Sequence, residues 1–233
     1  MCFLPVVPAQ VKALEYLNAV SQKCSGKIIV TGHSKGGNLA VYAAVHADAA
    51  IRERIVSVYS NDGPGFGKNI LDDPDYVEMR PRIINLVPQS SVVGMLLEHD
   101  ENFTVVKSRQ KAGLLQHNGL SWEILGNSFV HLKDVTPDSR KLDRTVNQWI
   151  RDMTPEQREE FAEAVYQLFS VDGAQTLTDL VAARKKWFAH TKTLDPRVHE
   201  TIQKMFSELI GISKISKIKD FFHRGAKEEG TEE

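Results

Sequence analysis

One stretch of the chain combines residue types that can perform nucleophilic chemistry with a spacing that would expose them. Residues 32–36 read Gly-His-Ser-Lys-Gly, so that Ser34 stands between two glycines. A serine hydroxyl attacks carbonyl carbon once a neighbouring base removes its proton. Glycine adopts backbone angles that other residues avoid. The pattern therefore predicts a strained turn that presents Ser34 as a nucleophile, with Gly32 and Gly36 placed where a side chain would collide with backbone.

The segments beside this turn predict the strand and the helix that it must join. Residues 28–30 are Ile-Ile-Val, a β-branched run typical of a parallel strand buried on both faces. Residues 39–45 favour a helix, and the glycines at 36 and 37 would let that helix sit close to the strand. A structural turn that happens to contain serine is the alternative interpretation.

A serine nucleophile also needs a base and an acid that orients the base. In sites built on this turn, the acid and then the histidine follow the serine along the chain. Asp62 comes directly after a predicted strand at residues 55–59 and is the favoured acid. Its alternative role is an Asx residue that organises the Gly-Pro turn after it. Glu98 and Asp100 are later alternatives in a charged, loop-like stretch.

His117 is the favoured base, because it follows the last predicted strand and lies in a polar turn where a catalytic histidine would be exposed. His131 and His99 compete for the role, although the apolar neighbours of His131 favour a packed histidine. His33 is interpreted as packing beneath the turn. The backbone N–H of Lys35 follows the nucleophile and is the expected donor to an oxyanion.

The wider pattern predicts an α/β fold with a parallel sheet flanked by helices. A helical period covers residues 8–24, and further strand candidates follow at residues 82–87 and 103–107. Strands that alternate with helices favour a parallel sheet. We therefore expect an α/β core at residues 1–135, a helical extension at 136–225 and a disordered tail at 226–233.

Two features mark the predicted helical extension. Residues 154–157 read Thr-Pro-Glu-Gln, a capping box with proline at the first helical position. Residues Ile212–Lys227 combine an apolar stripe with lysines and arginine, which is typical of a helix on an anionic membrane surface. Docking of the stripe on the preceding helices is the simpler interpretation.

Composition excludes several classes of function. The 233 residues carry a net charge of −1, so no global field would attract nucleic acid. The two cysteines have no metal-ligand spacing, and we expect neither a metal nor an organic cofactor. The reduced thiols and the proline-broken, uncharged start of the chain favour a cytoplasmic protein over a secreted one.

Four motifs in order resemble the bacterial lipase-like family of unknown function, which is related to the class 3 lipases of the α/β-hydrolase superfamily. They are the segments 32–40, 61–66, 87–96 and 116–122. The resemblance covers roughly residues 8–135 and implies a partial α/β-hydrolase fold with serine esterase or lipase activity on a small-molecule or lipid ester. It matches Ser34 with the nucleophile and His117 with the histidine.

The chain departs from this family in two ways. Class 3 lipases usually carry their acid near the segment 88–93, where this chain has Ser90 and Ser91, and this shifts the acid role towards Asp62. Family members also have strands before the helix that leads to the serine turn, with a loop that supplies the second oxyanion donor. We therefore expect the carboxyl-terminal part of the family domain, in which the strand at residues 28–30 would form a sheet edge with an uncovered apolar face.

Two classes of function remain from the sequence. The leading prediction is hydrolysis of carboxylic esters through an acyl-Ser34 intermediate, with His117 as base and Asp62 as its partner. Thioesterase and peptidase chemistry would use the same residues. The alternative is a catalytically weak or inactive interaction module that binds a partner or a membrane through its helices.

Overall fold

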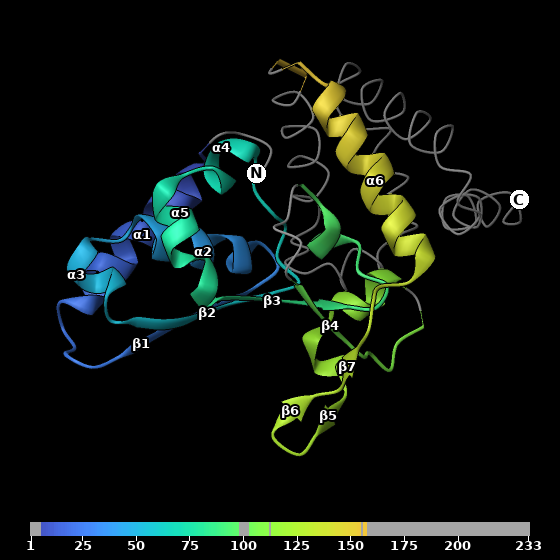
Figure 1. Cartoon of the computed structure of the whole chain (residues 1–233), viewed down its shortest axis with the longest axis horizontal. Helices are drawn as coiled ribbons and strands as arrows, with labels where there is room; N and C mark the ends of the chain where they lie inside the picture. Colours follow the sequence, from blue (N-terminus) through green and yellow to red (C-terminus); the bar gives the residue numbers. More distant parts are fainter. Residues whose placement is uncertain (1–5, 98–102, 112, 155, 158–233) are drawn as a thin grey trace, which may run out of the picture. The chain divides into compact units, whose positions relative to one another are not determined.

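The computed structural model describes residues 6–97, 103–111, 113–154 and 156–157. The chain forms two compact units, one of Cys2–Asn147 and the other of Gln148–Glu233 with Met1. The sheet, drawn in Figure 1, lies in the first unit, as does the candidate site.

A mostly parallel sheet forms the centre of this unit. Its strands, in order across the sheet, are β1 (Ile28–His33), β2 (Ile55–Asn61), β3 (Ile83–Pro88), β4 (Phe103–Val106) and the antiparallel β7 (His131–Leu132). The predicted α/β class and all four predicted parallel strands are confirmed. Because β1 to β4 are parallel, their carboxyl ends meet at one edge of the sheet, where the residues that follow each strand come together.

Helices cover one face of β1, β2 and β3 (Figure 1). The helices before β4 are α1 (Pro8–Ser21), α2 (Lys35–His46), α3 (Ala49–Arg52), α4 (Lys68–Leu71) and α5 (Pro74–Met79), and the 3₁₀ turns η1 (Arg80–Arg82) and η2 (Val93–Met95) flank β3. Val45 of α2, Val58 of β2 and Met79 of α5 are almost fully buried in one core cluster. Because strand side chains alternate between the two faces, Val58 of β2 points into this cluster while its chain neighbours point away.

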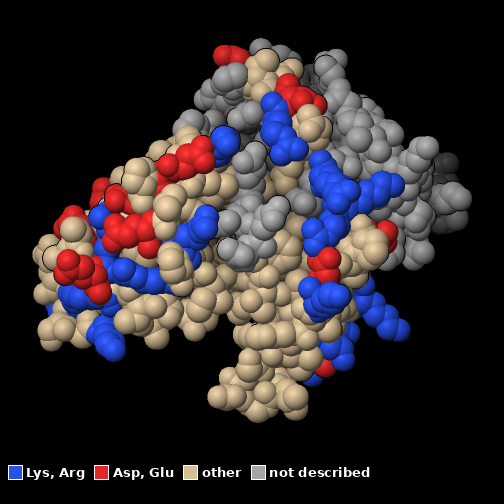
Figure 2. Space-filling model, in the orientation of Figure 1, with Lys and Arg blue, Asp and Glu red and all other residues tan. Residues whose placement is uncertain are grey.

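The opposite face is covered over β3 and β4 by a segment that follows β4. This segment contains η3 (Gly113–His117), η4 (Gly119–Ser121), β5 (Ile124–Leu125) and β6 (Ser128–Phe129). Trp122 packs with Leu86 and Val106, and its ring meets the edge of Phe129 at a centroid distance of 5.5 Å. The β5–β6 hairpin carries no charged residue and projects as an uncharged surface in Figure 2.

Strand β1 lies at an edge of the sheet in the described part of the chain. Its alternate residues Ile29, Thr31 and His33 are exposed, and the side chain of Ile29 is 62% accessible. The edge and the uncovered face thus lie where the sequence led us to expect them. An apolar edge strand of this kind can pair with another polypeptide.

Helix α6 (Pro137–Asp152) begins within the sheet unit. The Asn147 amide donates to the carbonyls of Met95 (3.2 Å) and Leu97 (3.0 Å), and the Ser139 hydroxyl donates to the carbonyl of Ser91 (2.5 Å). The sheet unit therefore includes α6 as far as Asn147.

The capping box after α6 is confirmed. Thr154 N–H donates to the side chain of Gln157 at 2.9 Å, and Gln157 N–H donates back to the Thr154 hydroxyl at 3.2 Å. The rest of the predicted helical extension, the basic amphipathic segment and the tail lie outside the described residues. No described helix has the length and the apolar character that a membrane crossing requires.

Candidate active site

The predicted turn forms between β1 and α2, with Ser34 in a strained conformation. Ser34 has φ 58° and ψ −131°, a region that costs a non-glycine residue of order 1–3 kcal/mol. Its N–H donates to the carbonyl of Asn61 at 2.9 Å, and its carbonyl accepts from Gly37 N–H at 2.8 Å. These bonds to β2 and α2 hold the strained residue, whose side chain is half-buried.

The two glycines of the motif have different roles. A Cβ atom added to Gly32 would lie 2.0 Å from the carbonyl oxygen of Gly36, whereas one added to Gly36 meets nothing within 4 Å. The prediction of a collision is therefore right for Gly32 and wrong for Gly36, because Gly36 faces open space in the first turn of α2. Gly37 does allow close packing, since a Cβ there would lie 2.7 Å from the Ser60 hydroxyl oxygen.

This difference gives a matched pair of variants. We expect Gly32→Ala to lower the free energy of unfolding by about 1–3 kcal/mol, since backbone must move to admit the methyl group. Gly36→Ala should leave it unchanged or raise it by up to about 1 kcal/mol through helix propensity. Urea unfolding followed by circular dichroism measures both, and equal midpoints for the two variants would contradict the assignment.

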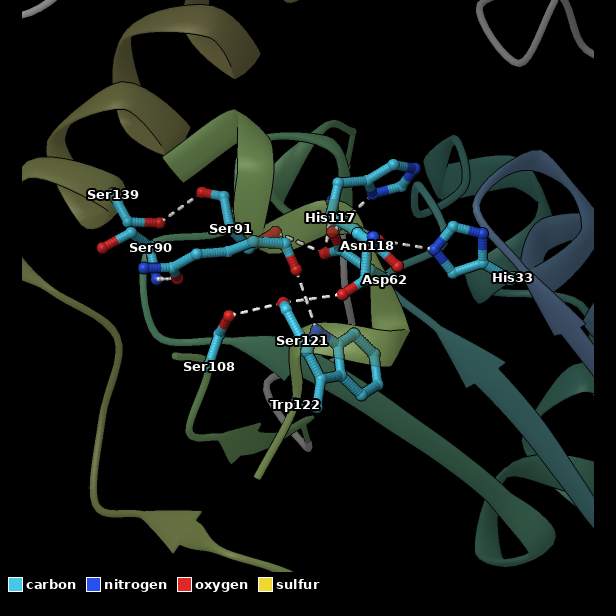
Figure 3. Close-up of polar contacts among 12 residues, drawn as sticks. His33, Asp62, Ser90, Ser91, Ser108, His117, Asn118, Ser121, Trp122 and Ser139 are labelled. Atoms are coloured by element: carbon cyan, nitrogen blue, oxygen red, sulfur yellow. Dashed lines mark hydrogen bonds and ion pairs between the residues drawn. The ribbon is translucent and has the colours of Figure 1, made fainter. Parts of the chain in front are cut away.

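Asp62 follows β2 and is fully buried. Its φ of 49° and the bond from its N–H to the Leu86 carbonyl (2.7 Å) turn the chain out of the strand. Oδ1 accepts from the Ser91 hydroxyl (2.5 Å) and from Gly94 N–H (3.0 Å), while Oδ2 lies 2.6 Å from His117 Nδ1. Three donors thus converge on one buried carboxylate (Figure 3). These bonds replace the alternative role in the Gly-Pro turn.

His117 ends η3, and neighbouring side chains hold it on the carboxyl-end edge of the sheet. The Gln116 side chain accepts from Ser90 N–H at 2.8 Å and donates to the Gln110 carbonyl at 2.7 Å. The Trp122 indole N–H donates to the Gln116 carbonyl at 2.8 Å. His117 is only 7% exposed, so the expectation of an exposed turn was wrong, because these bonds draw the segment onto the sheet.

The structure brings Asp62 and His117 together from positions 55 residues apart, as expected. Carboxylate contact at Nδ1 fixes that nitrogen as the protonated one, and leaves Nε2 to act as a base.

His33 lies elsewhere than the sequence suggested. It is exposed rather than packed beneath the turn, and its Nε2 lies 2.7 Å from the carbonyl oxygen of His117. The two imidazole rings are 4.5 Å apart between centroids. Because His33 directly precedes Ser34, this contact joins the end of β1 that leads into Ser34 to the segment that carries His117 (Figure 3).

Lys35 begins α2, and its side chain is exposed. The first N–H groups of a helix have no carbonyl partner within that helix and carry its positive dipole end. Lys35 N–H, the expected donor to an oxyanion, is therefore one of the groups without a carbonyl partner inside α2.

The competing candidates are placed away from this centre or outside the described residues. His131 is exposed on β7, so its interpretation as a packed histidine was wrong. Glu98, His99 and Asp100 lie outside the described residues. Ser91, in the segment where the resemblance led us to look for an acid, instead donates its hydroxyl to Asp62.

Several supporting residues were not found from the sequence. Ser91 and Gly94 bind the carboxylate, and Asn38 holds the loop after it by donating to the carbonyls of Pro64 (3.2 Å) and Gly65 (2.8 Å). Asn38 in turn accepts from Gln10 at 2.8 Å. In the sequence, the sign of Asn38 is a polar amide on the apolar face of the predicted helix, and that sign is weak.

A serine, a histidine and a carboxylate are the residue types that acyl transfer uses. No group of three or more potential metal ligands occurs among the residues that the structure describes.

A model of the family described as Mbeg1-like matches residues 1–167. Neither a curated protein nor a solved structure matches the chain.

Proposed function

The chain belongs to the Mbeg1-like family, whose name specifies no reaction. We therefore propose its function from the chemistry of Ser34, Asp62 and His117. We infer a serine hydrolase that cleaves carboxylic esters. The observation that carries this proposal is the buried Asp62 carboxylate 2.6 Å from His117 Nδ1, beside a strained serine turn. Burial of the Asp62 carboxylate costs desolvation free energy, and a turn with a purely structural role would not require it.

The reaction proceeds in two balanced steps. Ser34 Oγ attacks the acyl carbon while its proton passes to His117 Nε2, and Lys35 N–H donates to the oxyanion. The tetrahedral intermediate expels the alcohol, which takes the proton from His117. Water then attacks the acyl-serine with the same base and releases the acid. The Asp62 carboxylate stabilises the imidazolium that forms in each step.

The proposal also covers the fold family and the cellular location of the protein. The parallel sheet with its serine turn is consistent with part of an α/β-hydrolase sheet, in keeping with the resemblance to lipase-like proteins. A cytoplasmic location and a helical extension at residues 136–225 are parts of the same hypothesis. Acyl thioesters and amides are substrates that the same residues could attack.

A fluorophosphonate probe tests the proposal directly. We expect a single adduct at Ser34, located by mass spectrometry, that is lost in Ser34→Ala and retained in the exposed control Ser25→Ala. Labelling should also fall in His117→Ala. A folded chain that gains no adduct at Ser34 would overturn the proposal.

A second candidate function rests on strand β1. Its position at the sheet edge and the 62% exposure of Ile29 favour an interaction module that takes up an extended segment of another polypeptide. An unlabelled but folded chain would favour this module over the hydrolase.

A further inference from the structure

His33 contacts His117 in two ways, through a hydrogen bond and through ring packing. His33 Nε2 lies 2.7 Å from the His117 carbonyl oxygen, and the rings lie 4.5 Å apart with 40° between their planes. A carbonyl oxygen only accepts, so His33 must carry its proton on Nε2. One residue therefore contacts both the main chain and the ring of the proposed base.

Asp62 and His33 constrain different parts of His117. The Asp62 carboxylate holds Nδ1 and so fixes the rotation of the ring. The main chain of His117 belongs to the segment between β4 and β5, which is held at the neighbouring Gln116, and connecting segments of this kind move more than strands do. His33 ends β1, so its bond ties that main chain to the strand that carries Ser34.

We propose that His33 is a positioning residue for His117. It sets the separation between the base and the nucleophile by linking the His117 carbonyl to the strand end that leads into Ser34. The inference rests on the proposed hydrolase function for its kinetic consequence, and on the structure alone for the hydrogen bond.

Three substitutions separate the hydrogen bond from the ring contact. His33→Ala removes both, His33→Phe keeps a ring without a donor, and His33→Gln keeps an N–H donor without the ring. We expect His33→Ala and His33→Phe to slow acylation of Ser34 by the probe up to about 10²-fold, the size of effect that a shift of about 1 Å produces. His33→Gln should restore most of the rate. His131→Ala, which removes an exposed histidine of β7, is the control and should label at the parent rate.

A readout that does not depend on catalysis accompanies the kinetics. The proton on His117 Nδ1, in its 2.6 Å bond to Asp62, should give a far-downfield NMR signal in the parent. We expect that signal to broaden or shift in His33→Ala and His33→Phe and to return in His33→Gln, all recorded at a temperature where circular dichroism shows each variant to be folded.

The outcomes distinguish this inference from the proposed function. If the parent is not labelled, the hydrolase proposal fails, and the NMR signal alone decides the role of His33. An unchanged signal in His33→Ala would overturn the positioning role. Rescue by phenylalanine but not by glutamine would overturn the hydrogen bond as its cause.

Discussion

Replacement of Asp62 by asparagine is expected to slow acylation of Ser34 about 10⁴-fold, the scale of loss for an acid-to-amide change in a serine triad. The change is nearly isosteric, so the loss would arise from hydrogen bonding rather than from packing. Among substitutions that leave Ser34 and His117 in place, we expect this change to have the largest effect.

The bonds around Asp62 explain why asparagine fails. Both Ser91 and Gly94 donate to Oδ1, so an asparagine keeps its single oxygen on that side and turns its NH₂ group towards His117. Nδ1 of His117 must then accept a hydrogen bond, which moves the ring proton to Nε2. A histidine with a protonated Nε2 cannot take the proton of Ser34.

The rate of probe labelling measures this effect, with intact mass as the readout. Asp72→Asn is the matched control, because Asp72 is an exposed carboxylate that pairs with Lys68 at 3.7 Å. A rate for Asp62→Asn within tenfold of the parent would contradict the assigned role of the carboxylate.

Local sequence signals predicted the strands and the serine turn because these depend on neighbours in the chain. The apolar, β-branched runs of β1 to β4 and the capping box at Thr154 are examples. The β5–β6 hairpin and β7 escaped prediction, because each strand has only two residues. Their pairing depends on Trp122 and β4, which tertiary packing brings together.

The candidate site shows the same division. Asp62 and His117 were found because each follows a predicted strand, and parallel strands end at one edge of a sheet. Ser91 and Gly94 contact Asp62 across 29 and 32 residues, so no local pattern marks them. His33 was misplaced because strand alternation was not applied through the serine turn, although it puts His33 on the exposed face with Ile29.

Gly94→Ala is expected to lower the acylation rate of Ser34 about 10²-fold. The loss would arise because the new methyl group displaces the Asp62 carboxylate by about 1 Å. A Cβ at Gly94 would lie 2.2 Å from Asp62 Oδ1 and 2.8 Å from the Ser91 hydroxyl oxygen, closer than atoms can approach. The carboxylate must therefore move, and His117 follows because its Nδ1 is bound to the other oxygen. Stability should fall as well, since over-packing of a buried site costs about 1–3 kcal/mol.

Gly119→Ala provides the matched control for this prediction. It adds the same methyl group two residues from His117, but a Cβ there meets nothing within 4 Å. Probe labelling at a temperature where both variants are folded separates misplacement of the carboxylate from unfolding. If Gly94→Ala labels as fast as Gly119→Ala, the position of the Asp62 carboxylate does not limit the base, and the link from acid to histidine to serine fails at its first step.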